Sequence, residues 1–541
     1  MNLSILLIFG IVIGCLLAGK ILIHYFQLES YQFPGYFRTL RRNLLKAVMP
    51  GFCMTILLIA ALTVCILTSS SFSFTWAHYA AVTAVMVAGG WLTGRVFSEK
   101  NAKKAFVLTP RVKRLYAVAL IVLSLILLIV SGQIRTTGTL TTTGDRIAAG
   151  FVLVFPALLP MWIALSGLLA WPIEKGISEL YFRDAERILK SRKDLIRIGI
   201  TGSWGKTSVK FILGTLLEEK YHTLVTPASF NTPMGVTKVI RSRLEPGHRV
   251  FVAEMGARHV GDIKEMCRLV HPELGILTSV GPQHLDTFKT LERVVSTKYE
   301  LIDALPADGI SFFADDGDLC RGLYEKTVKE KMISGLDSAY DDVWAENIEY
   351  SPEGSSFDLC TKKERIRCRS QLLGELNIRN ILLCAAVAFR LGLTPEQIAR
   401  GIEKIRPVEH RLQLIRNPGG MSVIDDAFNS NIRGAKQAFQ VLRVFPEQRI
   451  VVTPGMVELG EKEYEMNREF GEAMADCCDV AILVGKKRSQ AIGEGLRTGG
   501  FAQERIHVVS SLDEATELLK QIVRPGDTVL FENDLPDNYS E

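Results

Sequence analysis

A glycine-bracketed turn, followed by a lysine and two hydroxyl residues, is the part of this sequence best suited to chemistry. It reads Thr201-Gly202-Ser203-Trp204-Gly205-Lys206-Thr207-Ser208 and follows the apolar run 195–200. Glycines let backbone N–H groups converge on an anion, the helix that begins there adds its dipole, Lys206 adds a charge and Thr207 offers a hydroxyl to Mg²⁺. The spacing is compact, because Ile200 occupies the first glycine position of the commoner motif. The stretch predicts a loop for nucleotide phosphates, with a plain glycine turn as the alternative.

Glu254 and His284 occupy comparable places after two other predicted strands. Glu254 directly follows the run 249–253, and His284 lies shortly after the run 274–279. Parallel strands end at a common edge of an open α/β sheet, where such folds bind their ligands. A carboxylate at that edge suits a Mg²⁺ ion that bridges nucleotide phosphates. The alternatives are an ordinary surface role for Glu254 and a loop role for His284.

Lys298 lies on the apolar face of a predicted helix. The other residues of that face are Leu291, Val294, Val295, Ile302 and Leu305. Burial disfavours a charged amine and lowers its pKa. A neutral amine can combine with CO₂ to give an anionic carbamate, which is able to bind a metal ion. The alternatives are a lysine whose amine reaches solvent and an ion pair with Glu300.

A second polar cluster is expected at the edge of a later sheet. The run Asp425-Asp426-Ala427-Phe428-Asn429-Ser430-Asn431 follows a predicted strand, and His410-Arg411 precede that strand. Carboxylates and amides at such an edge suit the ribose or adenine of a nucleotide. A polar turn without a ligand is the alternative.

Apolar strands alternating with amphipathic helices from residue 194 onward predict two α/β units. The expected strands are 195–200, 249–253, 274–279 and 310–314 in a central P-loop ATPase-type α/β domain (194–407). They are 421–424, 449–453, 480–484, 506–509 and 528–531 in a smaller Rossmann-like α/β C-terminal domain (408–541). The fold class is multi-domain, with an N-terminal helical transmembrane domain (1–172) and an amphipathic connector (173–193) before these units.

Five apolar blocks in the first 172 residues approach the about 20 residues that cross a bilayer. They are roughly 3–26, 48–68, 76–92, 116–130 and 147–171. A signal peptide before a buried helical domain does not explain them, because no basic N-terminal region is present and four further blocks follow. Pro172 begins the connector, whose apolar residues recur at helical spacing. The connector is expected to lie on the membrane surface or to pack against the next domain.

Charge is divided unevenly along the chain. Residues 1–193 hold 20 Lys and Arg against 7 Asp and Glu, and the remainder holds 43 against 51. The basic residues gather in alternate loops, so the positive-inside rule predicts a multi-pass protein of the cell membrane with its N-terminus outside and its catalytic domains in the cytoplasm. No nucleic-acid partner is expected, because these residues flank spans. Ten scattered cysteines without a C-x-x-C pair indicate reduced thiols and no structural zinc.

In combination, these segments resemble the Mur ligase family, the ATP-dependent amide-bond ligases of peptidoglycan precursor synthesis. The resemblance covers about Arg197 to Phe531. It also rests on Asn231-Thr232-Pro233-Met234-Gly235-Val236, Gly374-Glu375-Leu376-Asn377-Ile378-Arg379-Asn380 and Gly455-Met456-Val457-Glu458-Leu459-Gly460. Leu376 stands where the family has histidine, and Phe428 where it has tyrosine. The likeness is greatest to the branch that adds D-alanyl-D-alanine to a muramyl-peptide.

The resemblance implies a role for each matching residue. It implies ATP contacts by Gly202, Ser203, Trp204, Gly205, Lys206, Thr207, Ser208, Asn377, Asn380, Arg411, Asp426 and Asn429. It implies one Mg²⁺ on Thr207 and Glu254, a second on His284 and carbamylated Lys298, and substrate contacts by Asn231 and Thr232. Lys206, His284 and Lys298 are the implied catalytic residues. A substrate carboxylate would take the γ-phosphoryl group of ATP, and an amine would then displace phosphate from the acyl phosphate.

Two departures from the family leave the substrates open. A membrane block stands where soluble members carry the domain that holds a UDP-sugar, and residues 531–539 replace a lysine-glycine-serine stretch. A lipid-linked acceptor, with membrane lipids as partners, is therefore expected beside a muramyl-peptide. The alternatives are a ligase that adds amino acids or dipeptides to another surface polymer and, in a different class, a nucleotide-driven membrane transporter or sensor.

Overall fold

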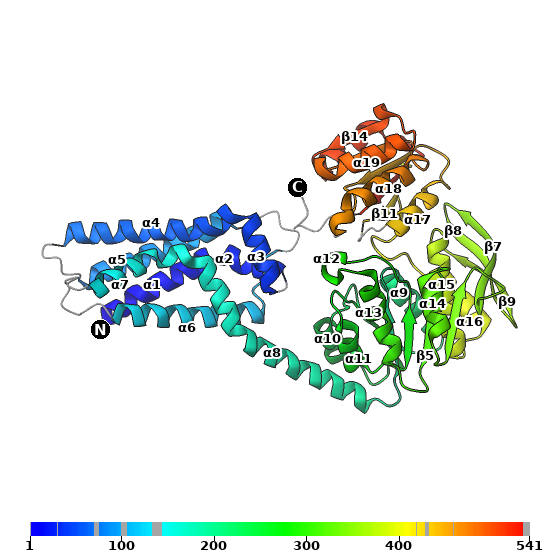
Figure 1. Cartoon of the computed structure of the whole chain (residues 1–541), viewed down its shortest axis with the longest axis horizontal. Coiled ribbons are helices and arrows are strands. Elements are labelled where there is room, and N and C mark those ends of the chain that lie inside the picture. Colours follow the sequence, from blue (N-terminus) through cyan, green and yellow to red (C-terminus); the bar gives the residue numbers. More distant parts are fainter. Residues whose placement is uncertain are drawn as a thin grey trace. The chain divides into compact units, whose positions relative to one another are not determined.

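The structure is a computed structural model of the 541-residue chain. It describes residues 2–29, 31–69, 75–98, 105–132, 143–417, 419–427, 432–457 and 459–533. The chain divides into two units, Met1–Glu179 and Leu180–Glu541. The first is entirely helical where it is described, and the second contains both sheets (Figure 1).

The helical unit places a helix at each of the five expected apolar blocks. Its helices are α1 (Asn2–Ala18), α2 (Lys20–Leu28), α3 (Phe33–Arg42), α4 (Leu44–Thr68), α5 (Trp76–Val96), α6 (Pro110–Gly132), α7 (Thr143–Val154), the short η1 (Phe155–Leu158) and α8 (Leu159–Ser191). Among the described residues, α4, α6 and the run 143–191 are long and apolar enough to cross a membrane. The bent pair α1 and α2, which meet at 46°, would make a fourth span. The described residues therefore give at most four candidate spans, whereas the sequence predicted five. The difference is α5, which is not among the helices that are long and apolar enough.

Helix α5 packs closely against α1 through glycines. A Cβ atom on Gly90 would lie 2.2 Å from the carbonyl oxygen of Gly14, and one on Gly94 would lie 2.3 Å from that of Leu17. A Cβ on Gly14 would in turn lie 2.4 Å from the carbonyl oxygen of Met86. Small residues allow apolar helices to approach this closely. The alanine- and glycine-rich composition of α5 therefore serves its contact with α1.

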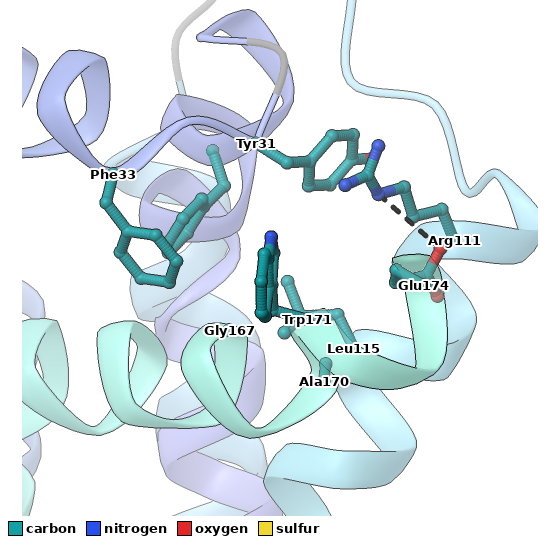
Figure 2. Close-up of a pocket in the computed structure, with 9 residues that line it drawn as sticks. Tyr31, Phe33, Arg111, Leu115, Gly167, Ala170, Trp171 and Glu174 are labelled. Carbon is teal, nitrogen blue, oxygen red and sulfur yellow. Dashed lines mark ion pairs between the residues drawn. The ribbon is translucent and has the colours of Figure 1, made fainter. Parts of the chain in front are cut away.

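A small pocket of mixed character lies where α2, α3, α6 and α8 meet (Figure 2). Its aromatic lining residues are Phe26, Tyr31, Phe33 and Trp171, and its charged ones are Arg111 and Glu174. The ring of Tyr36 stacks on that of Phe26, with 3.9 Å between the ring centroids. This pocket thus brings charged and aromatic side chains of the helical unit together.

Helix α8 runs through Pro172, where the sequence predicted the start of a separate connector. The helix is continuous there, because a helix can continue past a proline at the loss of one backbone hydrogen bond. Its last turns belong to the second unit, where Phe182, Ala185 and Leu189 are buried in an apolar core. Asp184 accepts a hydrogen bond of 2.7 Å from Arg241. Of the two expected placements, this end of the helix packs against the α/β domain.

The central domain is built on a nine-stranded sheet in the order β2-β3-β1-β4-β5-β6-β7-β8-β9. The strands are β1 (Ile196–Thr201), β2 (Thr223–Val225), β3 (Val250–Glu254), β4 (Leu274–Leu277), β5 (Ile310–Ala314), β6 (Lys331–Gly335), β7 (Val343–Ser351), β8 (Gly354–Thr361) and β9 (Arg365–Ser370). Neighbours from β2 to β7 are parallel, and β7, β8 and β9 form an antiparallel extension.

Helices cover both faces of this sheet, as expected for an α/β domain. One apolar core includes α9 (Lys206–Leu217), α15 (Glu375–Arg390) and α16 (Pro395–Lys404). The opposite core includes α10 (Pro233–Arg243), α11 (Asp262–Val270), α12 (Leu285–Phe288), α13 (Leu291–Asp303) and α14 (Leu319–Lys326). The sheet is therefore buried on both sides, which explains its continuous apolar strands.

The C-terminal domain has a six-stranded sheet in the order β10-β11-β15-β12-β13-β14. Its strands are β10 (Gln413–Arg416), β11 (Ser422–Asp426), β12 (Arg449–Thr453), β13 (Val480–Val484), β14 (Ile506–Val509) and β15 (Thr528–Glu532). The helices are α17 (Ile432–Leu442), α18 (Glu463–Ala475), α19 (Lys486–Thr498) and α20 (Leu512–Ile522), with short turns η2 (Gly460–Lys462) and η3 (Gln503–Arg505). All strand pairs are parallel except β10 with β11.

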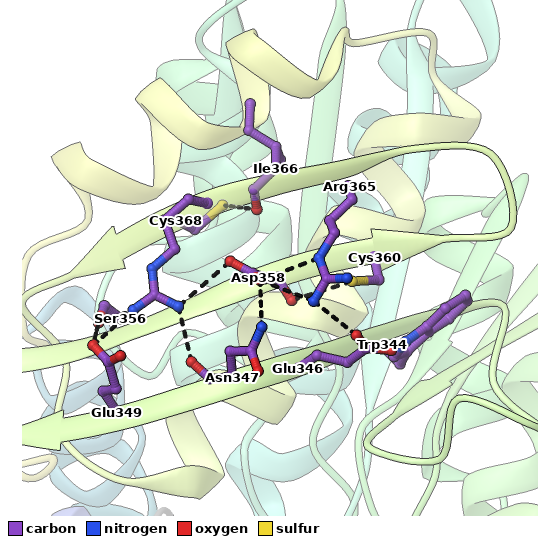
Figure 3. A network of polar contacts seen from close by, with 11 residues as sticks. Trp344, Glu346, Asn347, Glu349, Ser356, Asp358, Cys360, Arg365, Ile366 and Cys368 are labelled. Atoms are coloured by element: carbon purple, nitrogen blue, oxygen red, sulfur yellow. Dashed lines mark hydrogen bonds and ion pairs between the residues drawn. The ribbon is translucent and has the colours of Figure 1, made fainter.

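All nine expected strands are present. The strands that the sequence did not predict are either short or rich in polar residues. Strands β7 to β9 bury Phe357 and Cys368 on one face and carry charged side chains on the other. On that face Asp358 pairs with Arg365 at 3.0 Å and Arg367 at 3.4 Å (Figure 3). A search for continuous apolar runs does not detect strands of this alternating kind.

We expect Gly90→Ala to destabilise the helical unit, because the added Cβ collides with the backbone of α1. Overpacking of this kind costs about 1–3 kcal/mol. Thermal unfolding of the full-length chain in detergent measures the effect. Gly150→Ala in α7 is the matched control, since a Cβ at Gly150 meets no atom within 4 Å. Equal melting of the two variants would contradict close packing of α1 and α5.

Candidate active site

The glycine-bracketed turn lies between β1 and α9, where the sequence predicted a phosphate loop. Gly202 has a φ of +153° and Gly205 a φ of +81°. A Cβ on Gly202 would lie 2.1 Å from Thr278 Oγ1, so no larger residue fits there. Both glycines are therefore required by the backbone, and the loop brings its N–H groups to the start of α9.

The loop is fastened to the segment that follows β4. Ser203 Oγ donates to the carbonyl oxygen of Gly281 at 2.9 Å and accepts from the N–H of Gly281 at 3.0 Å. The N–H of Trp204 donates to Ser279 Oγ at 2.8 Å. These bonds place the segment that leads to His284 directly beside the phosphate loop. Ser203 and Trp204 thus have a structural role besides the predicted contact with ATP.

Lys206 folds back over the loop that precedes it. Its Nζ donates to the carbonyl oxygens of Gly202 at 2.7 Å and Ser203 at 3.1 Å. Burial lowers the pKa of Lys206 to about 8, with Glu254 opposing and Arg411 reinforcing the shift. An anion at the loop would favour the charged form of this amine. Thr207 and Ser208 follow in the first turn of α9.

Glu254 ends β3 and is almost fully buried. Its Oε1 accepts hydrogen bonds from Thr207 Oγ1 at 3.2 Å and from Asn231 Nδ2 at 3.0 Å. Its Oε2 accepts from Lys210 Nζ at 2.9 Å. Burial would raise the pKa of Glu254, but the charges of Lys210 and Lys206 outweigh it and lower the pKa below its ordinary value. The carboxylate is therefore ionised and held beside Thr207, as a magnesium ligand would be.

Lys210 is the site residue that the sequence did not predict. The exposed fractions of the Lys210 and Glu254 side chains are 0% and 1%, so their ion pair is dry. Lys210 Nζ also donates to the carbonyl oxygen of Ala228, whose φ of +43° is uncommon for alanine. The ammonium thus joins α9, β3 and the loop after β2. The sequence signal was a lysine among the apolar residues Val209, Ile212 and Leu213 on α9.

Asn231 and Thr232, the predicted substrate contacts, lie between this ion pair and α10. Asn231 reaches Glu254, as described, and its carbonyl oxygen accepts from the N–H of Gly256 at 2.8 Å. Thr232 Oγ1 accepts from the N–H of Gly235 at 3.3 Å and caps α10. The structure therefore ties Asn231 to the candidate metal carboxylate, and Thr232 to the start of a helix.

Lys298 is buried on α13, as its place on the apolar face predicted. Its exposed fraction is 1%, and its Nζ makes no hydrogen bond or ion pair with the described part of the chain. Burial lowers the pKa of Lys298 well below its usual range, and the nearby charge of Lys206 lowers it further. Glu300, the alternative partner, instead accepts hydrogen bonds from the N–H groups of Gly261 at 2.9 Å and Lys264 at 2.8 Å.

His284 begins the turn before α12. Its φ is +50°, and its carbonyl oxygen accepts from the N–H groups of Thr287 and Phe288 at 3.0 Å each. Its side chain is half-buried. Within the described ranges, no three His, Cys, Asp or Glu side chains converge on a metal site.

The two predicted asparagines lie in the first turns of α15. Asn377 Nδ2 donates to the carbonyl oxygen of Leu373 at 2.9 Å, so it is engaged with its own chain segment. Asn380 approaches the phosphate loop, because its Oδ1 would lie 3.3 Å from a Cβ on Gly205. Both are buried. The structure places Asn380 beside the loop and gives Asn377 a local hydrogen bond.

Residues of the C-terminal domain extend the site. The half-buried Arg411 has a pKa lowered by desolvation, with Asp426 and Glu254 as the opposing charges. Burial raises the pKa of Asp426 to about 6, although its Oδ1 accepts from the N–H of Leu412 at 3.0 Å. His410 Nδ1 lies 2.7 Å from Asp425 Oδ2. Asn429, the remaining predicted ATP contact, lies outside the described residues.

A cavity of about 840 Å³ opens beside this cluster. Thr207 and Phe211 of α9 line one side, and Ala228 and Ser229 belong to the loop that Lys210 holds. The charged lining residues are the basic Lys404, Arg406 and Arg411 and the acidic Glu218, Glu219 and Glu409. Ligand pockets of this size hold molecules as large as nucleotides. The cavity therefore offers space for a ligand of nucleotide size next to Thr207, with Arg411 among its lining residues.

Two family models match the chain. The model described as the Mur ligase middle domain matches residues 200–388, and that described as the Mur ligase glutamate ligase domain matches residues 410–532. The UDP-N-acetylmuramoyl-tripeptide–D-alanyl-D-alanine ligase of Mycobacterium tuberculosis strain CDC 1551 is 31% identical over 62% of this chain and 69% of its own. The chain belongs to the Mur ligase family. It is therefore an ATP-dependent ligase, as the resemblance to this family implied.

Other relatives agree with this assignment. The Escherichia coli K12 protein with the same name is 28% identical over 64% of this chain and 78% of its own. The crystal structure of MurF ligase from Thermotoga maritima in complex with ADP has a TM-score of 0.60, 25% identity, and coverage of 66% and 80%. Neither matching family model includes the helices before residue 200.

We expect Lys210→Met to destabilise this Mur ligase, because it leaves Glu254 charged and buried without its partner. Breaking a buried pair in this way costs about 3–5 kcal/mol. Thermal unfolding of the full-length chain without nucleotide is the measurement. The double variant Lys210→Met/Glu254→Gln should recover most of the loss, and Lys264→Met, at an exposed position of α11, is the control. If Lys210→Met has the same melting temperature as the wild type, the structural role of the ion pair is contradicted.

Proposed function

We propose that this ligase uses ATP to join D-alanyl-D-alanine to a muramyl-peptide in the synthesis of peptidoglycan precursors. The observation that carries the proposal is the contact of Thr207 with ionised Glu254 beside the phosphate loop, in a chain whose relatives are named for that reaction. Residues 194–407 form the ATP-binding domain in this proposal, and residues 408–541 form the domain that completes the nucleotide site.

Lys206 and the loop amides act on the phosphates in the first step. Lys206 exchanges its two carbonyl partners for the γ-phosphoryl group, whose negative charge returns the amine to its charged form. An acceptor carboxylate oxygen attacks phosphorus, the bond to the ADP oxygen breaks, and an acyl phosphate forms. Arg411 lines the neighbouring cavity and interacts with the charge of Asp426, so both are our candidates for contacts with the nucleotide.

Thr207 and Glu254 fit a Mg²⁺ ion by the chemistry of their atoms. Both present oxygen, which Mg²⁺ prefers, and Lys210 occupies Glu254 Oε2 so that Oε1 is the atom beside Thr207 Oγ1. When bound, Mg²⁺ would neutralise part of the negative charge on the phosphates. Lys210 keeps the carboxylate in one orientation and holds the loop that contains Asn231.

Lys298 fits carbamylation because its amine is buried and without a hydrogen-bond partner among the described residues. The neutral amine nitrogen forms a bond to the carbon of CO₂ and releases one proton, which gives an anionic carbamate. His284 and this anion are our candidates for ligands of a second Mg²⁺ ion. In the second step the amine of D-alanyl-D-alanine attacks the acyl carbon, phosphate leaves, and the nitrogen loses a proton.

We expect Lys298→Ala to lower the ligation rate about 10- to 100-fold, the range for loss of a group that supports a metal site. A short carboxylate added to the assay should restore part of the rate, because it supplies the missing anion. ADP release is the measurement, and Lys264→Ala is the control. Full activity of Lys298→Ala, or a loss that no carboxylate reverses, would contradict the carbamate.

We also propose a membrane setting for the reaction. Three described stretches are apolar enough to span, and the basic loops favour a multi-pass arrangement with the N-terminus outside and the ligase domains in the cytoplasm. An acceptor that is itself attached to lipid would then be held at the membrane. This acceptor replaces the soluble UDP-linked one in our proposal, while the ATP chemistry remains the same.

An ADP-release assay on the full-length chain in nanodiscs tests both the proposed ligase reaction and the proposed lipid-linked acceptor. We expect release to require D-alanyl-D-alanine and to be faster with a lipid-linked muramyl-peptide than with the UDP-linked form. Equal rates with the two acceptors would overturn only the lipid-linked proposal. Release with single amino acids and another surface polymer, but with no muramyl acceptor, would overturn the peptidoglycan assignment.

A further inference from the structure

Two arginines share one carboxylate at the start of α6. Arg114 donates to both oxygens of Glu174, at 2.5 and 2.9 Å. Arg111 Nε lies 3.6 Å from Glu174 Oε2, too far for a hydrogen bond. One carboxylate thus faces two guanidinium groups, and the three side chains together carry a surplus of one positive charge. The Arg111 side chain is 40% exposed, so this surplus charge is accessible.

Aromatic side chains surround this charge. The Arg111 guanidinium lies over the ring of Tyr31, 4.0 Å from its centroid. Figure 2 shows Trp171 rising from α8 toward Tyr31 and Phe33, with Arg111 and Glu174 at the side of the pocket. Tyr and Trp beside cationic groups are typical of the headgroup level of a bilayer, because one end of each ring is apolar and the other polar.

The pocket lies at the end of a candidate membrane span. Arg111 and Arg114 are in the first turn of α6, which is long and apolar enough to cross a membrane. The N-terminus of this helix adds a partial positive charge. Basic pockets between such helices bind the phosphate of anionic lipids.

We propose that this pocket binds the phosphate headgroup of a membrane lipid. Arg111 binds the phosphate, and the ion pair between Arg114 and Glu174 fixes the positions of α6 and α8 beside it. Tyr31 and Trp171 lie on either side of the headgroup. The pocket is small, about 20 Å³, so the phosphate lies at its mouth against Arg111, while the acyl chains lie against the apolar helices. None of these residues takes part in the ATP site, so the inference stands independently of the ligase reaction.

Lipid binding to the full-length chain in a neutral detergent tests the proposal by native mass spectrometry. The probes are dioctanoyl phosphatidic acid, the diacylglycerol with the same chains, and inorganic phosphate. We expect phosphatidic acid to bind and diacylglycerol to bind more weakly. Arg111→Gln should lower the affinity for phosphatidic acid about fivefold, the effect of one basic residue near a lipid surface. Glu174→Gln should raise it, because a competing negative charge is removed.

Arg41→Gln is the matched control, because it removes one exposed charge from α3 outside the pocket and should leave the affinity unchanged. An equal loss in Arg41→Gln and Arg111→Gln would show diffuse surface attraction and overturn the proposal. Weaker binding by Glu174→Gln would mean that the carboxylate only supports the fold. Inorganic phosphate that competes as well as the lipid would overturn the lipid assignment. ADP binding in the same samples reports that each variant is folded.

Discussion

The dry ion pair between Lys210 and Glu254 is the interaction on which the arrangement of the ligase site depends. A buried carboxylate is tolerated only with a partner and with its remaining lone pairs satisfied. Lys210 meets that need for Oε2, while Thr207 and Asn231 donate to Oε1. The same ammonium holds the carbonyl oxygen of Ala228. One helix, one strand and one loop are thereby placed together before any nucleotide binds.

The parallel sheet explains why these groups meet at one edge. Strands β1, β3 and β4 are neighbours, and the loops that leave their carboxyl ends carry Gly202, Glu254 and Ser279. Hydrogen bonds between Ser203 and Gly281 then make the phosphate loop and the segment before His284 one structural element. Burial has opposite consequences for the charged groups here. It lowers the pKa of Lys206 and Lys298, whereas Glu254 stays ionised because two lysines face it.

The helical unit is organised by different physics. In the membrane setting that we propose, apolar burial does not distinguish one helix neighbour from another, so close backbone contact selects the partner. Gly14 and Gly90 provide that contact between α1 and α5. Polar groups are then concentrated at the end of the unit, where Arg111, Arg114 and Glu174 lie among aromatic rings. The unit therefore combines a tightly packed interior with a charged, accessible end.

The sequence by itself determined the phosphate loop, the parallel strands, the apolar helices and the burial of Lys298, because each depends on local spacing or on a period of hydrophobicity. It did not predict strands β7 to β9, whose outer face is charged, nor the continuation of α8 through Pro172. Only the tertiary structure decided which oxygen of Glu254 faces Thr207, and that Glu300 caps α11 instead of pairing with Lys298. Such choices depend on residues far apart in the chain meeting in a space closed to water, and no local pattern records them.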